Sequence, residues 1–264
     1  EGINFDLIYG LPFQTRESFH STLDQVIAML PDRIALYNYA RLPSLLKHQS
    51  ILEKYPLPSA EERVAIFTLA LQRLTDAGYE AIGMDHFALR EDSLAHALHN
   101  GTLYRNFMGY TVKQGAHLIG VGASAIGEVG GGFFQNVRKP SDYEARLENG
   151  LATLRGLVLT PDDLRRKWVI QRLMCQFLVP FDAFESEFSC AFEMTFSREL
   201  SALEGFYQDG ILERIPAGIR VTPLGRLFVR NVAMVFDAYL HKQTHHFSKT
   251  RSEEHTSELQ SPMF

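Results

Sequence analysis

The chain has 264 residues, of which 45% are hydrophobic, 11% aromatic and 22% charged, a composition typical of a globular protein with a sizeable core. Its formal net charge of −5 disfavours nucleic acid or an anionic membrane as the main partner, and no apolar run is long enough to predict a membrane-spanning helix. Two isolated cysteines, Cys175 and Cys190, suit a reducing compartment, so we expect a cytoplasmic protein without a disulfide framework.

The first third of the chain alternates strand-like and helix-like segments. Strands are predicted over 2–11, 33–39 and 79–84. Between them, Pro12 and Thr15 introduce a helix to about residue 30, and a second helix is predicted over 59–77. Ser59 is placed to cap the second helix, and Glu62, three residues on, fits a capping box. Strand, helix, strand, helix, strand at these spacings predicts an α/β fold with parallel strands and crossover helices.

The remaining segments change in character along the chain. Residues 103–135 are rich in Gly and aromatics, which predicts strands and close-packed loops, and Ser141 is placed to cap a following helix. Thr160 then precedes a proline and two acids, a favourable helix start. Further helices are expected over 196–207 and 224–239, with a hairpin over 211–221 between them. Helices followed by a short hairpin resemble a winged helix, and we expect domains at 1–150 and 151–250.

Both ends of the sequence have unusual features. The chain starts at Glu1 without Met and enters a strand-like run almost at once, from which we infer truncation. The string RSEEHTSELQS within residues 251–264 resembles the translation of a DNA-sequencing adapter, so we expect a disordered tail without packed contacts.

Two residues at predicted strand ends are candidates for ligand contact. Asp6 lies inside the apolar run NFDLIYGLP, and a buried carboxylate needs a hydrogen-bond donor or a cationic ligand. Strand carboxyl ends face the ligand in parallel α/β folds. Ala40 closes the second strand in NYARLP, where a small residue lets a ligand approach the backbone. The alternatives are a structural Asp bonded to backbone amides and tight packing at Ala40.

Three further polar residues could meet a charged substrate. Asp85 and His86 follow the third strand in GMDHFAL, but adjacent residues on an extended chain point opposite ways, so we do not expect them to form one dyad. Arg105 and Asn106 occur in YRNFMGY, and an Arg side chain can bind carboxylates with two hydrogen bonds. The alternatives are a structural role for His86 and a surface position for Arg105.

A glycine-rich segment formally fits G-x-G-x-x-A from Gly120 to Ala125, with Asp142 about 20 residues further on. We reject a dinucleotide site because that motif must open a helix, and more glycines follow at once. The glycines instead allow close backbone approach to a ligand, with Ile126 as an apolar wall. His96 with His99, and three histidines at 241–246, have possible metal spacings, but no Cys or carboxylate completes a set, so no metal site is predicted.

The motifs FDLIYGLP, NYARLP, IGMDHFAL, RNFMGYT and GVGASAIG, in this order and spacing, resemble the oxygen-independent coproporphyrinogen III oxidases of HemN type, in the radical SAM superfamily. The segments RGLVLTPDDLRRKWVI and GIRVTPLGRLFVRNVAMVFD resemble the C-terminal domain of that family. The resemblance covers about residues 2–250. It implies a partial (β/α) barrel followed by a small helical, winged-helix-like domain.

The resemblance also implies an activity and a site. Such an enzyme decarboxylates two propionate side chains of coproporphyrinogen III to vinyl groups, giving protoporphyrinogen IX in haem biosynthesis. It uses two S-adenosyl-L-methionine molecules and a [4Fe–4S] cluster. Matching motif by motif, Asp6, Ala40 and Ile126 correspond to cofactor-binding positions. Arg105, Asn106 and His86 are expected to bind substrate, and no catalytic residue is identified. Expected partners are coproporphyrinogen III and an electron donor for a monomeric enzyme.

Two departures from the family pattern are visible. The CxxxCxC motif of the cluster is absent, and two cysteines cannot replace it, so this fragment is expected to be inactive alone. Met108 stands where the family pattern leads us to expect Gln. Both departures concern contacts to cofactor or substrate.

Two other functions compete with this one. A haem chaperone of HemW type shares YGLP, but carries a YEISNFA-like segment where this chain has IGMDHFA. A winged-helix DNA-binding module over residues 160–242 is disfavoured because that stretch has 10 Lys+Arg against 11 Asp+Glu.

Overall fold

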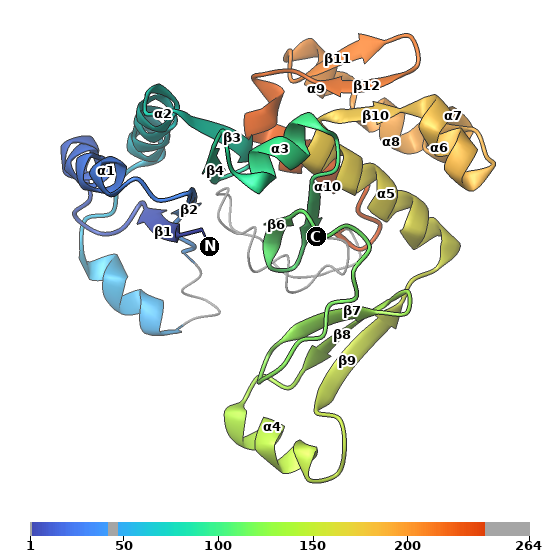
Figure 1. Cartoon of the computed structure of the whole chain (residues 1–264), viewed down its shortest axis with the longest axis horizontal. Coiled ribbons are helices and arrows are strands. Elements are labelled where there is room, and N and C mark those ends of the chain that lie inside the picture. The colour runs from blue at the N-terminus through green and yellow to red at the C-terminus, as the bar shows by residue number, and fades with distance from the viewer. Residues whose placement is uncertain (1, 42–46, 241–264) are drawn as a thin grey trace.

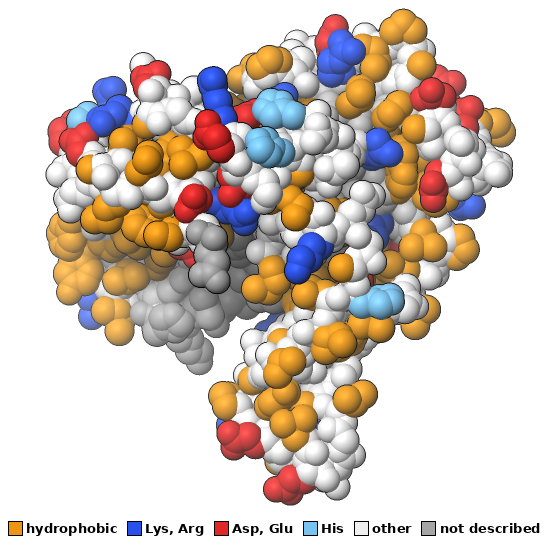
Figure 2. Space-filling model, in the orientation of Figure 1, with side chains coloured by type: hydrophobic (Ala, Val, Ile, Leu, Met, Phe, Trp, Pro, Cys, Tyr) orange, Lys and Arg blue, Asp and Glu red, His pale blue; other side chains and the backbone are white. Residues whose placement is uncertain are grey.

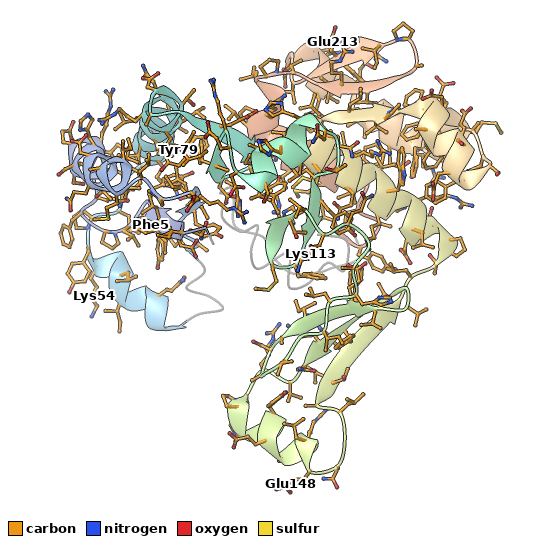
Figure 3. All side chains as sticks on the ribbon, viewed as in Figure 1. Phe5, Lys54, Tyr79, Lys113, Glu148 and Glu213 are labelled. Atoms are coloured by element: carbon orange, nitrogen blue, oxygen red, sulfur yellow. The ribbon has the colours of Figure 1, made fainter. Side chains whose placement is uncertain are left out.

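The computed structural model describes residues 2–41 and 47–240. Figure 1 shows a sheet with long helices beside it, an arm that extends away from this sheet, and a helical C-terminal unit. In Figure 3, Glu148 lies at the far end of the arm, remote from Phe5 and Tyr79 in the sheet. Within the described part of the chain, no helix is long and apolar enough to cross a membrane.

The four-stranded sheet has the order β1-β2-β4-β3. Its strands are β1 (Asn4–Tyr9), β2 (Arg33–Asn38), β3 (Tyr79–Gly83) and β4 (His86–Leu89), and its helices are α1 (Arg16–Met29) and α2 (Ala60–Asp76). The strands β1 and β2 are parallel and joined by α1, as predicted. The sheet therefore begins with the α/β crossover unit that the spacing indicated.

The prediction of neighbouring parallel strands fails at β3. Strand β4 pairs antiparallel with both β2 and β3, so it separates them, although β3 runs in the same direction as β2. The chain reverses within Met84 and Asp85, since Gly83 pairs with His86 and Met84 has a φ of 48°. This tight turn places β4 beside β3 immediately, and β4 then takes the place next to β2.

Local signals at the helix starts are confirmed. Thr15 caps α1, and Ser59 forms the predicted capping box with Glu62 at the start of α2. These contacts satisfy amide groups that have no partner inside the helix. The connecting segments include a 3-10 helix, η1 (Lys47–Lys54), and the short helix α3 (Ser93–His99).

The two faces of the four-stranded sheet differ. The face that packs on α1 and α2 is apolar and closed, with a core formed by Tyr9, Phe19, Leu23, Val26, Ile34, Leu36, Ile66, Phe67, Ala70, Leu74, Tyr79 and Phe87. Along β1, Phe5 and Leu7 pack against this core, whereas Asn4, Asp6 and Ile8 on the other face are exposed. We call this second face the inner face. It carries the candidate site residues of the sheet.

The arm follows a small hairpin. The hairpin is β5 (Tyr104–Asn106) and β6 (Gly109–Thr111), and the arm is the antiparallel sheet β7 (Ile126–Val129), β8 (Gly132–Asn136), β9 (Thr153–Val158) with α4 (Pro140–Leu147) at its end. Strands and loops were predicted for the stretch up to β8. The prediction of Ser141 as a cap is wrong, because the helix starts at Pro140, whose fixed φ suits the first helical position.

The predicted division between residues 150 and 151 stays a prediction. Strand β9 lies just after that point and pairs with β8. The arm sheet therefore contains residues from both sides of the predicted division and ends before Leu159. Figure 2 shows hydrophobic side chains on the surface of the arm. They include Val129, Leu147, Leu151, Leu154 and Val158.

The C-terminal unit contains short helices and a three-stranded antiparallel sheet, in agreement with a small helical, winged-helix-like domain. Its elements are α5 (Pro161–Gln176), β10 (Leu178–Pro180), α6 (Phe181–Phe188), α7 (Phe192–Thr195), α8 (Ser197–Ala202), α9 (Glu204–Gln208), β11 (Leu212–Ile215), β12 (Gly218–Val221), η2 (Gly225–Phe228) and α10 (Val229–Met234). The continuous helices predicted over 196–207 and 224–239 are wrong. The first breaks at Leu203, and the second has a 3-10 turn before α10.

The 3-10 helix η2 packs closely on the residue that precedes β11. A Cβ on Gly225 would lie 2.0 Å from the carbonyl oxygen of Ile211. The core of the unit is aromatic. Phe184, Phe192, Phe196 and Phe236 are fully buried and their rings contact one another.

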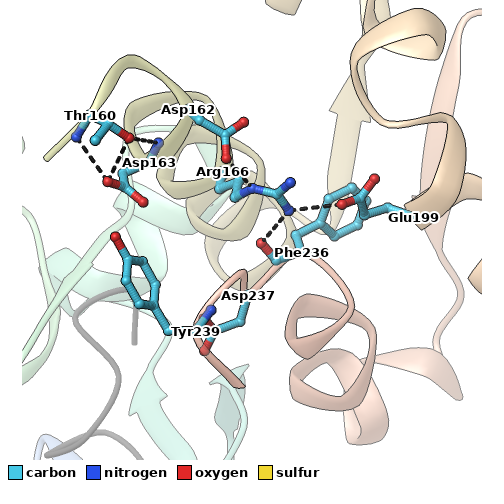
Figure 4. Close-up of polar contacts among 8 residues, drawn as sticks. All are labelled: Thr160, Asp162, Asp163, Arg166, Glu199, Phe236, Asp237 and Tyr239. Atoms are coloured by element: carbon cyan, nitrogen blue, oxygen red, sulfur yellow. Dashed lines mark hydrogen bonds and ion pairs between the residues drawn. The ribbon is translucent and has the colours of Figure 1, made fainter. Parts of the chain in front are cut away.

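A polar network closes the start of α5 (Figure 4). The Asp163 carboxylate accepts hydrogen bonds from the amide and the hydroxyl of Thr160, which form the predicted helix start. Arg166 pairs with Asp162 and Glu199 and donates to the carbonyl of Phe236. The network ties the last described segment to α5.

Candidate functional site

The inner face of the sheet brings two predicted residues into one row. Asp6 pairs with Ala35 across β1 and β2, and Ala35 pairs with His86 across β2 and β4. Directly paired residues project to the same face of a sheet. Asp6 and His86 are therefore presented on the same side, on strands that flank β2.

Asp6 does not have the buried environment that its apolar neighbours suggested. Its side chain is exposed, and Oδ1 accepts a hydrogen bond of 2.7 Å from Asn4 Nδ2. The expectation of a buried carboxylate is wrong because helices cover only the opposite face of β1, where Phe5 and Leu7 point. An exposed carboxylate on the inner face is available to a polar or cationic ligand.

Ala40 lies just beyond the carboxyl end of β2. Its carbonyl accepts a hydrogen bond of 2.9 Å from Gln49 Nε2, and the amide of Tyr39 donates to the carbonyl of Tyr9. Beside Ala40, the Tyr39 hydroxyl and, on the helix-covered face, Asn38 Oδ1 are buried and have no hydrogen-bond partner among the described residues. Burial also raises the pKa of Tyr39, so the phenol remains a proton donor at neutral pH. Buried polar atoms normally have a partner, which makes this strand end a candidate ligand site.

Asp85 and His86 form the pair that the sequence argued against. His86 Nδ1 and Asp85 Oδ1 lie 2.9 Å apart, and both side chains are largely buried. The argument assumed an extended chain, whereas Asp85 belongs to the tight turn between β3 and β4. The contact orients the imidazole so that Nε2 faces the hairpin, where a Cβ on Gly109 would lie 3.4 Å from it.

Aromatic rings enclose His86. The ring of Tyr37 lies 6.0 Å away and the ring of Tyr110 lies 5.3 Å away, both edge to face. The sequence argument did not single out Tyr37 or Tyr110. The sequence contained a signal for both residues. Tyr37 is two residues after Ala35 on β2 and therefore lies on the same face, and Tyr110 lies in the aromatic segment that forms the hairpin.

Arg105 is buried at 7% exposure, so the alternative of a surface position is wrong. Its guanidinium lies over the Tyr110 ring at 5.9 Å, and its backbone exchanges hydrogen bonds with the Gln171 side chain of α5. Arg105 and His86 thus contact the same tyrosine ring. Asn106 instead caps the hairpin turn, where Oδ1 accepts from the amide of Met108 at 2.8 Å, and Met108 itself is 82% exposed.

Ile126 begins β7, and the glycine-rich segment before it is a loop. The prediction that this segment is not a dinucleotide-binding turn is confirmed, because a strand follows it and no helix. Asn136 Nδ2 donates to the carbonyls of Gly120 and Gly122, which shapes the loop. A Cβ on Gly120 would lie 2.6 Å from the carbonyl oxygen of Ile126, so only glycine allows this approach.

The candidates thus lie in three places. Asp6 and His86 belong to the four-stranded sheet and Ala40 lies just beyond β2, Arg105 and Asn106 belong to the hairpin, and Ile126 lies on the arm. The convergence of Asp6, Ala40 and Ile126 on one adenosyl-sized ligand stays a prediction.

Within residues 2–41 and 47–240, no group of three or more His, Cys, Asp or Glu side chains could hold a metal ion. His99 Nε2 lies 2.8 Å from Glu80 Oε2 at the surface, and His241, His245 and His246 fall outside the described residues, as does the predicted tail. Burial raises the pKa of the Cys175 thiol to about 12, so it stays protonated and is a poor ligand. The two cysteines do not fit an iron–sulfur cluster.

The chain is similar to known proteins over most of its length. Residues 159–228 match the HemN C-terminal domain. The chain is 44% identical over 241 residues to an oxygen-independent coproporphyrinogen III oxidase of Salmonella typhimurium, covering 91% of this chain and 53% of the relative. Identity to the enzyme of the same name from Thermostichus vulcanus is 40% over 246 residues, covering 92% of this chain and 76% of that one.

A solved structure agrees with these relatives. Coproporphyrinogen III oxidase (HemN) from Escherichia coli, described as a radical SAM enzyme, superposes with a TM-score of 0.87 at 40% identity. The match covers 90% of this chain and 55% of that one. The chain thus spans about half the length of most relatives it matches.

Proposed function

The chain belongs to the family of oxygen-independent coproporphyrinogen III oxidases, and from this premise we propose that the longer protein oxidatively decarboxylates two propionates of coproporphyrinogen III to vinyl groups. The product is protoporphyrinogen IX, an intermediate of haem biosynthesis. The proposal includes a monomeric, cytoplasmic enzyme that receives electrons from a donor protein. The observation that carries the proposal is the inner face, which presents a carboxylate and an oriented histidine on the strands that flank β2.

The residues at the end of β2 fit S-adenosylmethionine. The Tyr39 hydroxyl can donate a hydrogen bond, and it is buried without a partner among the described residues. Asp6 adds an acceptor for hydroxyl or amino groups, and the small side chain of Ala40 leaves room for the ligand. When bound, S-adenosylmethionine supplies the radical chemistry of the reaction. We propose two such molecules per site, with Ile126 packing against the second.

The cluster formed by Arg105, Tyr110 and His86 suits the substrate. Coproporphyrinogen III carries four propionates, and a guanidinium binds carboxylates well. Arg105 is held by the Tyr110 ring and by Gln171, so little conformational freedom is lost on binding. His86, oriented by Asp85, can present Nε2 to a second carboxylate. Asn106 is proposed to act in the same region through its amide.

Ligands of the iron–sulfur cluster are not assigned to this chain, because its two cysteines do not fit a [4Fe–4S] cluster. What this chain contributes is binding and orientation of the organic ligands.

Binding of S-adenosylhomocysteine to the full-length protein tests the cofactor assignment. We expect Asp6→Ala to raise the dissociation constant by about tenfold to a hundredfold, the effect of losing hydrogen bonds to a charged group. Asp76→Ala is the matched control, because Asp76 is exposed and ends α2 on the opposite side of the sheet. Equal affinity for the Asp6 variant and the control would contradict this assignment.

Turnover of coproporphyrinogen III by the full-length protein tests the activity itself. We expect protoporphyrinogen IX to form under anaerobic conditions with S-adenosylmethionine and a reductant. Stable haem binding without turnover would favour the chaperone instead, and salt-sensitive binding to duplex DNA would favour the winged-helix alternative.

A further inference from the structure

Helix α5 is joined to the arm by a group of side chains that the proposed function does not use. Lys167 of α5 forms an ion pair with Glu128 of β7, and its ammonium lies 5.2 Å above the ring of Phe133 on β8. The ring of Phe107, in the hairpin turn, contacts Phe133 edge to face at 5.2 Å. Tyr104 of β5 also shares a hydrogen bond with Lys167. We call these five residues the Lys167 brace.

The brace is shielded from water. The side chains of Lys167 and Glu128 are 17% and 21% exposed. Burial raises the pKa of Tyr104, and the nearby ammonium opposes that rise. Charges in such an environment interact more strongly than charges at an open surface, so the pair can hold two elements in one orientation.

The brace lies on the same face of the arm as Ile126. Glu128 pairs with Phe133, and Ile126 pairs with Gln135, one step further along the same two strands. Residues two apart on a strand share a face, so Glu128 and Ile126 point to the same side. Gln135 is buried and bonded to the loop at Ser124, which makes this part of the arm rigid.

We propose that Lys167 is a positioning residue of the oxidase site. Helix α5 lies in the stretch that matches the HemN C-terminal domain, whereas Ile126 belongs to the arm. Through Glu128 and Phe133, Lys167 sets the angle of the arm and therefore the place at which Ile126 meets its ligand. The inference rests on the proposed function only for the identity of that ligand.

Amide hydrogen exchange in this chain tests whether Lys167 holds the arm in place. We expect Lys167→Gln to speed exchange of the β7 and β8 amides by about tenfold, because about 1.4 kcal/mol of local stabilisation is lost. Arg214→Gln is the matched control: Arg214 also combines an ion pair, with Glu204, and a ring contact, with Tyr207, but on the far side of the C-terminal unit. The control should leave the arm unchanged.

Charge exchange separates positioning from general destabilisation. The double variant Lys167→Glu with Glu128→Lys restores the ion pair, so it should recover at least half of the lost protection, and Lys167→Arg should retain most of it. Circular dichroism of each variant reports whether the chain folds. Unchanged exchange in Lys167→Gln, or no recovery in the double variant, would overturn the proposal.

The same variants in the full-length protein test the link to the site. Lys167→Gln should raise the KM for S-adenosylmethionine about tenfold while kcat changes less than about twofold, since misplacement of a ligand wall weakens binding. Loss of kcat with an unchanged KM would overturn the positioning role. Absence of turnover in the unmodified protein would contradict the proposed function. The exchange results would still show whether the Lys167 brace holds the arm in place.

Discussion

The four-stranded sheet and the C-terminal unit bury their residues in opposite ways. In the sheet, α1 and α2 cover one face, and the inner face keeps Asp6 and Ile8 exposed. In the C-terminal unit, phenylalanine side chains from α6, from α7 and from the turns after α7 and α10 meet in a closed core, and a polar network seals the start of α5. The sheet thus exposes polar groups that can act on a ligand, whereas the C-terminal unit uses its groups for packing.

Because of this difference, the residues that stabilise the fold and the residues that can bind a ligand lie in different regions. Substitutions in the aromatic core should lower the free energy of unfolding, and substitutions on the inner face should change binding without much effect on stability. The exception is the contact between Asp85 and His86. It lies in the turn that joins β3 to β4, and it also orients the imidazole, which is a candidate binding group. The comparison can be tested quantitatively.

The largest effect is expected in the aromatic core. Phe192 is fully buried, stacks on Phe181 at 4.3 Å and contacts Phe184 and Phe196. Phe192→Ala should lower the free energy of unfolding by about 3–5 kcal/mol, because a large cavity replaces the ring. Chemical denaturation measures the change. Met194→Ala, in the same helix but at 83% exposure, is the control, and equal effects of the two variants would contradict a closed core.

The next effect extends the comparison to the arm. Gly120→Ala places a Cβ 2.6 Å from the Ile126 carbonyl oxygen, and a backbone atom cannot move away cheaply. We expect a loss of about 1–3 kcal/mol, seen as faster amide exchange in β7. Gly205→Ala, at a helical glycine with no atom within 4 Å of the new Cβ, should be neutral or stabilising by up to about 1 kcal/mol. A harmless Gly120→Ala would show that the loop can shift.

The helix caps offer a matched comparison of the two regions. Thr15 and Thr160 both form capping boxes, but the partner of Thr160 is Asp163, which is only 3% exposed. Each Thr→Ala variant should cost about 1 kcal/mol in thermal or chemical unfolding, with the larger loss at Thr160 because a buried carboxylate loses a donor. A larger loss at Thr15 would be inconsistent with this account.

The Asp163 carboxylate predicts an acid sensitivity of the C-terminal unit. Burial would raise its pKa, but hydrogen bonds from Thr160 and Tyr239 outweigh burial and hold the pKa below the ordinary value of 3.8. The group therefore stabilises the fold fully above that ordinary value, and the contribution is lost as the pH falls through the lower folded value. Asp163→Asn should flatten the dependence of unfolding free energy on pH below about 4. An unchanged slope would exclude Asp163 as its source.

The smallest effect on stability is expected on the inner face. Asp6→Ala should change the free energy of unfolding by less than about 0.5 kcal/mol, because the side chain is exposed and its partner Asn4 can bond to water. Chemical denaturation beside Asp76→Ala provides the comparison. A loss of several kcal/mol would show that Asp6 is a structural residue, and the ligand assignment would then lose its support.

The candidate site was only partly visible from the sequence. Positions near predicted strand ends brought out Asp6, Ala40 and His86, the glycine-rich segment brought out Ile126, and the resemblance assigned their roles. The sequence argument missed the Asp85–His86 contact, because it treated a tight turn as extended chain. It also took Arg105 for a possible surface residue, since its burial depends on Gln171 of α5, 66 positions away in the sequence.

The sequence by itself determined the helix starts at Thr15, Ser59 and Thr160, the parallel unit β1-α1-β2 and the family of the chain. These features depend on interactions between residues three or four apart, or on the order of motifs. Only the tertiary structure decided that β4 separates β2 from β3, that the inner face leaves Asp6 exposed and that Lys167 meets Glu128. Such facts depend on which surfaces cover one another, and residues far apart in the chain settle that together.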